Sequence, residues 1–233
     1  MSEERTALLL GASGLVGGQC LHLLLAEPGY RSVTAVLRRP LSFNHEKLTE
    51  RLLNFDLLGE DRDLFAVDDI YCCLGTTIRK AGSREAFRKV DYEYPVAAAR
   101  LGAAVGAKRL MLVSSLGANP AATSFYVQVK GETEEGVRSA NLPFTAIFRP
   151  SLLLGERKEF RIFEVLAAPV ARAVSVAMIG KWRKYRSIQA EVVARAMIRS
   201  AWSAGAGVEI FESDRIQELG AEKPAGEVSQ HNP

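Results

Sequence analysis

The sequence predicts an α/β fold whose core is a doubly wound parallel sheet. Short apolar runs alternate with segments of helical periodicity, which is typical of repeated strand–helix units. Most of these runs are apolar at every position, as in strands that are covered on both faces. The predicted strands are residues 6–10, 32–37, 51–55, 69–74, 109–114, 144–148 and 208–211.

The predicted helices follow from apolar spacing between these strands. They are residues 15–26, 83–105, 124–139 and 189–203. Pro95 is expected to split the second of them, because proline lacks the backbone N–H that a helix interior uses. The connection 38–47 is too short for a full crossover helix, which departs from the ideal doubly wound pattern.

Length and composition favour one globular domain. The 233 residues are compatible with a single domain over 1–220, followed by a polar tail over 221–233. Hydrophobic residues make up 48% and charged residues 24% of the chain, which excludes collagenous, disordered and disulfide-scaffold classes. The net charge of +3 is too small to indicate nucleic-acid or membrane binding from bulk charge.

Cysteine usage and the chain's apolar stretches bear on its location. Cys20, Cys72 and Cys73 are odd in number, and the last two are adjacent, so we expect core thiols in a reducing compartment. The beginning of the sequence lacks the pattern of a signal peptide. The stretch 162–180 is interrupted by charged residues and a proline, so no transmembrane segment is expected. These features predict a cytoplasmic protein, and the scattered histidines predict no metal site.

A glycine-rich loop joins the first predicted strand to the first helix. Its pattern is G-x-x-G-x-x-G, starting at Gly11. The first glycine allows a tight turn, the second lets the backbone approach a pyrophosphate, and the third lets the helix pack closely on the strand. A glycine-rich turn without a ligand is the alternative. The candidate cofactor-binding residues here are Gly11, Ser13, Gly14, Leu15, Val16 and Gly17.

Two arginines follow the second predicted strand. A site that prefers NAD carries an acidic residue in this region to bind the ribose 2′-hydroxyl, whereas this chain has Arg38 and Arg39. Their charge would attract a 2′-phosphate, so NADP(H) is predicted over NAD. The alternative is a pair of solvated loop arginines.

A Ser, Tyr and Lys constellation follows the fifth predicted strand. That strand ends at Ser114 and Ser115, and Tyr126 and Lys130 come soon after, on one face of a helix. An ammonium beside a phenol favours the phenolate, so the tyrosine can exchange a proton with an alcohol or carbonyl oxygen. A serine hydroxyl can hold that same oxygen. A packed tyrosine and an exposed lysine on an ordinary amphipathic helix are the alternative.

These residues together resemble the short-chain dehydrogenase/reductase superfamily, in its extended or atypical branch. The sequence is most similar to the Tat-interacting-protein oxidoreductase family and its bacterial relatives, over roughly residues 6–220. The resemblance is carried by Gly11-Ala-Ser-Gly14, Arg38-Arg39, Cys72-Cys-Leu-Gly-Thr-Thr77, Lys80-Ala-Gly82, Val90-Asp91, Ser114-Ser115, Tyr126-Val-Gln-Val-Lys-Gly-Glu132 and Phe148-Arg-Pro150.

The resemblance implies an NADPH-binding Rossmann fold with strand order 3-2-1-4-5-6-7 and a small substrate-side lobe at approximately 151–187. It implies that Lys130 holds the nicotinamide ribose. Asp91 stands where many reductases of the superfamily carry Asn, and of the two serines we favour Ser115 as the substrate-facing one. The further cofactor-binding residues that the resemblance implies are Leu74, Gly75, Arg149, Pro150, Leu153 and Arg161.

The expected function is that of an NADPH-dependent oxidoreductase acting on a small carbonyl or hydroxyl compound. Tyr126 would be the proton donor or acceptor, with Lys130 and Ser115 as the other catalytic residues. An epimerase-like enzyme, or an NADPH-binding regulatory or scaffold protein with little turnover, is the alternative, and a homodimer or a regulatory protein partner is left open. The cations and aromatics of 181–186 could contact nucleic acid, but this is the least favoured interpretation.

Overall fold

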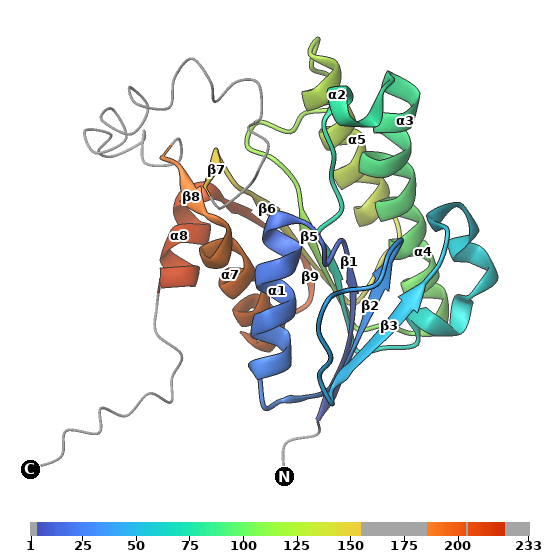
Figure 1. Ribbon diagram of the computed structural model, residues 1–233. Helices are drawn as coiled ribbons and strands as arrows, with labels where there is room; N and C mark the ends of the chain where they lie inside the picture. Colours follow the sequence, from blue (N-terminus) through green and yellow to red (C-terminus); the bar gives the residue numbers. More distant parts are fainter. Residues whose placement is uncertain (1–3, 155–185, 204, 222–233) are drawn as a thin grey trace, which may run out of the picture.

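The computed structural model describes residues 4–154, 186–203 and 205–221. Its core is a seven-stranded parallel sheet with the order β3-β2-β1-β4-β5-β6-β9 (Figure 1). This confirms the predicted fold class and the strand order that the resemblance implied. The strands are β1 (Arg5–Leu10), β2 (Tyr30–Leu37), β3 (Leu48–Leu52), β4 (Asp69–Cys72), β5 (Arg109–Val113), β6 (Phe144–Arg149) and β9 (Gly207–Glu212).

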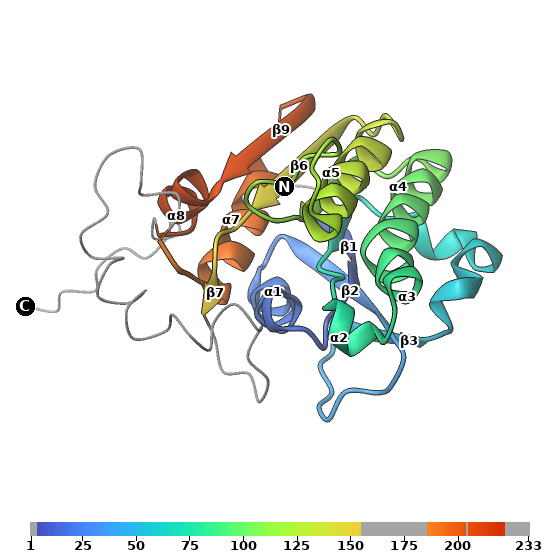
Figure 2. The same cartoon turned by 90° about the horizontal axis from the view of Figure 1, so that it is seen from above.

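Helices cover both faces of the sheet. Figure 2 shows one helical layer formed by α1 (Leu15–Ala26), α7 (Ala190–Ser203) and α8 (Ser213–Ala221), and another formed by α2 (Ile78–Ala81), α3 (Arg84–Arg88), α4 (Tyr94–Val105) and α5 (Phe125–Arg138). The central strand β1 explains this arrangement. Ala7 and Leu9 belong to the apolar cluster under α1 and α7, while Leu8 and Leu10 belong to the cluster under α4. A strand buried on both faces needs apolar residues at every position.

Two strands end two or three residues earlier than predicted. β3 spans Leu48–Leu52 rather than 51–55, because the chain leaves the sheet at Leu53 and Phe55 begins a 3₁₀ helix (Phe55–Glu60). The buried Phe55 side chain packs into the core from that helix, so its apolarity does not mark a strand. β4 ends at Cys72 rather than at residue 74: the Cys73 N–H still donates to Leu10 O of β1 at 2.9 Å, and the chain then leaves the sheet.

The helical region 83–105 is interrupted just before Pro95 rather than at it. A π-helical turn over Lys89–Glu93 separates α3 from α4, and Pro95 lies in the first turn of α4. Proline leaves the carbonyl four residues earlier, that of Asp91, without its helical N–H partner. The Thr133 hydroxyl of α5 lies 2.7 Å from this carbonyl oxygen and 2.7 Å from Val129 O, so the two carbonyls share its one proton.

Several short elements were not predicted. They include α2, α8, a second 3₁₀ helix (Arg62–Phe65) and a two-stranded parallel pair, β7 (Leu153–Leu154) with β8 (Ile188–Gln189). The connection 38–47 carries no helix, as expected. Most of the proposed substrate-side lobe, the stretch 162–180 and the tail beyond Ala221 lie outside the described residues. Within the described part of the chain, every helix is too short or too polar to cross a membrane.

Candidate functional site

A pocket lies at the carboxyl ends of the central strands, where the sheet order reverses between β1 and β4. This is the position at which open α/β sheets bind their ligands. The chain segments around it come from the start of α1, the loops after β4, β5 and β6, and one face of α5. The lining residues are Gly14, Leu15, Val16, Cys73, Leu74, Gly75, Val113, Ser114, Ser115, Tyr126, Lys130, Pro150, Ser151 and Leu153.

The glycine loop forms one wall of the pocket from backbone. The Gly14 N–H donates to Gly11 O at 2.9 Å, and α1 begins directly afterwards. A Cβ on Gly17 would lie 2.0 Å from Gly11 O, so only glycine lets the helix start pack this closely on the turn. The N–H groups at a helix start and the helix dipole favour an anion. This bare wall therefore fits the pyrophosphate of a dinucleotide.

The two serines at the end of β5 have different surroundings. Ser114 donates from its hydroxyl to Glu134 Oε1 at 2.5 Å, and both side chains are buried. A hydroxyl has one proton to donate, so that of Ser114 is engaged within the protein. Both serines line the pocket just beyond the end of β5. This arrangement supports Ser115 as the serine that would contact a substrate.

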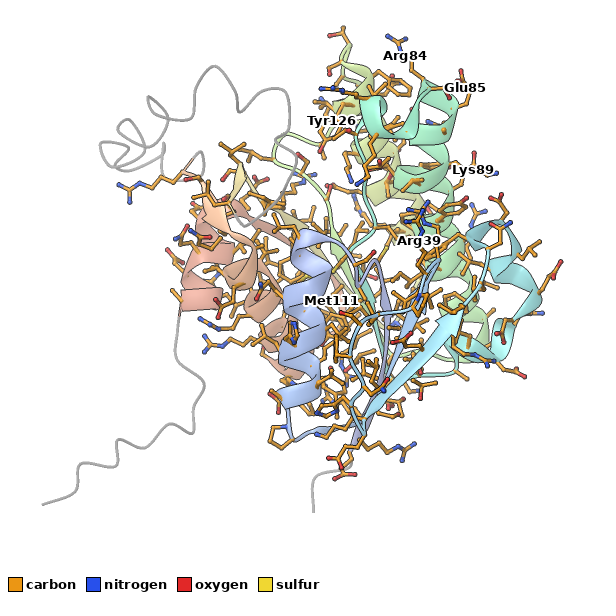
Figure 3. All side chains as sticks on the ribbon, viewed as in Figure 1. Arg39, Arg84, Glu85, Lys89, Met111 and Tyr126 are labelled. Carbon is orange, nitrogen blue, oxygen red and sulfur yellow. The ribbon has the colours of Figure 1, made fainter. Side chains whose placement is uncertain are left out.

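Helix α5 brings Tyr126 and Lys130 to the pocket. The Tyr126 ring packs on the buried Phe87 of α3, with ring centroids 5.7 Å apart. In Figure 3, Tyr126 lies toward the carboxyl ends of the strands, well above Met111 in the sheet. The helix approaches the loop after Ser115 closely, since a Cβ on Gly131 would lie 2.2 Å from the Pro120 nitrogen. The Gly131 position thus helps bring serine, tyrosine and lysine to one pocket.

Lys130 is buried in an ion pair. Its Nζ lies 2.7 Å from Asp91 Oδ1, and the two side chains are 7% and 1% exposed. The other oxygen of Asp91 accepts a hydrogen bond from the backbone N–H of Thr76 at 2.8 Å. The residue that replaces the usual Asn of the superfamily therefore contacts the lysine of the Tyr-x-x-x-Lys motif directly.

Arg149 lies beside the pocket rather than in its lining. Its Nε and one terminal nitrogen donate to the Glu134 carboxylate at 2.6–3.2 Å, and its other terminal nitrogen donates to Glu212 at 3.0 Å. The hydrogen bonds that Arg149 donates to Glu134, together with the charges of Glu134 and Glu212, raise the pKa of Arg149. Its role in cofactor binding stays a prediction. Pro150 and Leu153 do line the pocket, and Arg161 lies outside the described residues.

Arg38 and Arg39 are exposed in the loop after β2 and are also outside the pocket lining. Figure 3 shows Arg39 near the carboxyl end of that strand. The contacts that hold the loop include a hydrogen bond of 3.2 Å from the Leu41 N–H to Glu50, and the Phe43 ring, which stacks on His22 of α1 with ring centroids 5.5 Å apart. The arginines therefore lie beside the strand next to β1, where an adenosine ribose is expected.

Sequence reasoning missed Cys73, Val113 and Ser151 as lining residues. Cys73 directly precedes Leu74 at a strand end, and that position was the signal that could have found it. The side-chain hydrogen bond with Cys20, together with burial, raises the pKa of the Cys73 thiol well above its usual value. Among the described residues there is no cluster of His, Cys, Asp or Glu that could hold a metal ion.

Comparison with known proteins identifies the family. A family model described as NAD(P)H-binding matches residues 11–201. The chain belongs to this NAD(P)H-binding family. Protein HTATIP2 of Rattus norvegicus is 34% identical over 223 residues, which cover 94% of this chain and 90% of that protein. Protein FMP52, mitochondrial, of Candida albicans is 35% identical over 159 residues, or 66% of this chain and 69% of that protein. The resemblance stated above is thereby confirmed.

Solved structures share the fold at low sequence identity. MoeE5, in complex with UDP-glucuronic acid and NAD, superimposes with a TM-score of 0.69 at 17% identity, covering 88% of this chain and 75% of that one. The Bordetella bronchiseptica enzyme WbmH, in complex with NAD⁺, gives 0.69 at 14% identity, covering 94% and 80%. These likenesses extend the Rossmann-type architecture over most of the chain.

The predicted cytoplasmic location is contradicted by the names of the fungal relatives. FMP52 proteins of Candida albicans, Scheffersomyces stipitis and Lodderomyces elongisporus are all named mitochondrial. Free thiols argue only against an oxidising environment. They do not separate one reducing compartment from another, which is why the prediction was wrong.

Proposed function

We propose that this protein is an NADPH-dependent oxidoreductase of the short-chain dehydrogenase/reductase type, acting on a small carbonyl or hydroxyl compound. The observation that carries the proposal is that a single pocket is lined both by the glycine-loop start of α1 and by Ser115, Tyr126 and Lys130. A cofactor held by the first group would lie beside the second. Membership of the NAD(P)H-binding family supports the nucleotide part of the proposal.

In this proposal, different residues of the chain bind different parts of the cofactor. The N–H groups at the start of α1 hold the pyrophosphate, and the Lys130 ammonium holds the nicotinamide ribose. Arg38 and Arg39 attract the 2′-phosphate, which distinguishes NADPH from NADH. Bound NADPH supplies the hydride for the reaction.

The remaining chemistry is a proton transfer at the substrate oxygen. The Ser115 hydroxyl donates a hydrogen bond to that oxygen and orients it. The Tyr126 hydroxyl gives its proton to the same oxygen during carbonyl reduction and takes it back during alcohol oxidation. The Lys130 ammonium stabilises the phenolate that this transfer leaves on Tyr126.

The test is NADPH consumption by the purified protein with a panel of small aldehydes, ketones and quinones. We expect turnover with at least one of them. Tyr126→Phe should lower turnover by about 10²-fold or more while NADPH affinity changes by no more than a few fold. Tyr94→Phe is a matched control, because the Tyr94 hydroxyl donates to Asp56 on the surface and does not line the pocket.

Two outcomes would contradict the proposal. Unimpaired turnover in Tyr126→Phe would remove the phenol from the mechanism. Tight NADPH binding without consumption by any compound of the panel would instead support a regulatory or scaffold protein, especially if a partner protein co-purifies only when NADPH is present.

A further inference from the structure

The Asp91–Lys130 ion pair borders the pocket through Lys130, and both side chains are almost fully buried. A Cβ on Gly75 would lie 3.6 Å from Asp91 Oδ1 and 3.9 Å from Lys130 Nζ, so the pair lies directly behind the backbone of a lining residue. At 7% side-chain exposure, the Lys130 ammonium has little access to water. Burying an ammonium without a counter-charge costs several kcal/mol, and the group then tends to lose its proton.

Asp91 is itself held in place from three directions. Its carboxylate contacts Lys130 Nζ at 2.7 Å and accepts from the Thr76 N–H at 2.8 Å. Its backbone carbonyl accepts from the Thr133 hydroxyl at 2.7 Å. Lys130 and Thr133 belong to α5, while Thr76 belongs to the loop after β4. The residue therefore joins the helix that carries the catalytic face to the loop that carries Gly75.

We propose that Asp91 is a positioning residue whose carboxylate keeps the Lys130 ammonium charged and fixed beneath Gly75, ready for the cofactor ribose. The inference deepens the proposed function, since it rests on the role given there to Lys130. It assigns a purpose to an acidic residue where many members of the superfamily carry Asn. An Asn at this position could accept from the Thr76 N–H but could not balance the charge of the lysine.

The thiols near the ion pair stay protonated at physiological and moderately alkaline pH. Burial raises the pKa of Cys72, on β4, to about 12, and Lys130 and Asp91 both act on that thiol. The hydrogen bond with Cys20 and burial raise the pKa of Cys73 well above its usual value. Both thiols therefore stay neutral at physiological and moderately alkaline pH.

Several charged groups on the neighbouring helices have partners within the protein. On α5, Glu134 binds Arg149 and Glu132 binds Arg88 of α3. The Arg88 guanidinium also lies over the Tyr92 ring of the π-helical turn. Two more groups come from the π-helical turn and the start of α4: Lys89 pairs with Asp56, and Tyr94 donates to the same carboxylate. Tyr126 lines the same pocket as Lys130, so the test is carried out in a Tyr126→Phe background, which removes the phenol hydroxyl.

The experiment measures NADPH affinity by calorimetry from about pH 6 to about pH 10 in the full chain. Asp91→Asn keeps the shape of the side chain and removes its charge, whereas Asp91→Glu keeps the charge and changes the shape. In Asp91→Asn, we expect the alkaline loss of NADPH affinity to move to lower pH by about one unit or more, because the unbalanced ammonium releases its proton earlier. Asp91→Glu should keep the original pH midpoint, with weaker binding.

A matched control is Asp69→Asn. Asp69 is also a fully buried carboxylate, and it pairs with Arg109 at 2.7 Å at the opposite end of β4. This variant should unfold at lower temperature without moving the pH midpoint of NADPH binding. A merely structural role for Asp91 would give the same result in Asp91→Asn, so superimposable pH profiles for that variant and its parent would overturn the proposal.

Failure of the proposed function gives a different result. If the parent protein binds no NADPH at any pH, the proposed function is wrong, and thermal unfolding then tests the ion pair by itself. Asp91→Asn and Lys130→Met each remove one charge of the pair and keep the other one buried, whereas the double variant removes both charges. We expect the double variant to unfold at a higher temperature than either single variant. Additive losses would overturn the pairing role of Asp91.

Discussion

Gly17 and Gly18 are adjacent glycines at the start of α1 whose surroundings differ. A Cβ on Gly17 would lie 2.0 Å from Gly11 O, whereas one on Gly18 would lie 3.6 Å from Ala12 O, an ordinary contact. Gly17→Ala should therefore displace the glycine turn, weaken NADPH binding by at least about tenfold and lower the unfolding temperature. Calorimetric titration and thermal unfolding measure both effects.

Gly18→Ala is the control for that prediction. Replacing a glycine in a helix interior by alanine reduces the conformational freedom of the unfolded chain, so we expect a gain of about 0.5–1 kcal/mol in the free energy of unfolding. NADPH affinity should stay unchanged. Equal affinities in the two variants would show that the close approach at Gly17 has no part in binding the nucleotide.

The cysteines allow a second prediction about single residues. Burial raises the pKa of Cys72 to about 12, and the contact with Cys20 together with burial raises the pKa of Cys73. The thiolate is the reactive form, so neither residue should react with iodoacetamide at about pH 8 while the protein is folded. Mass spectrometry after denaturation should show both alkylated. Rapid modification of native Cys73, which lines the pocket, would contradict the prediction.

At the scale of elements, the connection between β2 and β3 determines the cofactor preference that we propose. We expect NADPH to bind at least tenfold more tightly than NADH, or by about 1.4 kcal/mol. Arg38→Asp should remove this preference, because a carboxylate repels the 2′-phosphate and can accept from a ribose hydroxyl. Arg31→Asp, an exposed position on β2 outside this loop, should leave the preference intact. Equal affinity of the parent protein for both nucleotides would refute the prediction.

The elements that the sequence predicted well are those with strong local patterns. β1, the glycine turn and α1 are consecutive, and their boundaries follow from apolar runs and glycines alone. β3 was misplaced because an edge strand is half exposed and carries few apolar residues. The apolar Phe55 was taken for part of the strand, although it belongs to a 3₁₀ helix. The π-helical turn lies just before Pro95, and the Thr133 hydroxyl that contacts the freed Asp91 carbonyl comes from a segment far away in the chain.

The same distinction between local and distant contacts applies to the candidate site. The spacing of Tyr126 and Lys130 is local, and the structure brings both to one pocket with Ser115. The partners of these residues are not local. The pairing of Lys130 with Asp91 depends on how α5 packs on the π-helical turn. The choice between the two serines depends on the hydrogen bond from Ser114 to Glu134.

At the scale of the whole molecule, buried tyrosine and cysteine side chains determine how the stability of the fold responds to alkaline pH. The Tyr30 hydroxyl donates to Asp69 at 2.5 Å and contacts the Tyr71 hydroxyl at 2.8 Å, and all three residues are buried. Burial, and then the nearby charge of Asp69, raise the pKa of Tyr30. Burial likewise raises the pKa values of Tyr71 and Cys72. In each case the folded protein holds a proton that the unfolded chain releases at lower pH.

This difference determines the sign of the pH dependence. The stability is complete below the unfolded pKa values, which are 9.0 for Cys72 and 10.0 for the tyrosines, and it is lost as the pH rises above them. Each such group adds a slope of about 1.4 kcal/mol per pH unit. Urea unfolding at a series of pH values measures the decline. Tyr71→Phe should be less stable near neutrality but decline less steeply, and an unchanged slope would exclude Tyr71 as a contributor.

The parallel order of the sheet also dictates how the chain must be assembled. No two described strands of the sheet form a hairpin, so every pairing has to close a long segment of chain, which slows folding. The sheet grows from β1 in two directions, first to β2 and β3 and then through β4, β5 and β6 to β9. A nascent chain that ends before β9 would leave the edge of β6 open and Phe148 without its stacked partner Phe211, 5.0 Å away. Open apolar edges promote aggregation. At this last stage of synthesis, chaperones that cover the edge of β6 should therefore protect the nascent chain most.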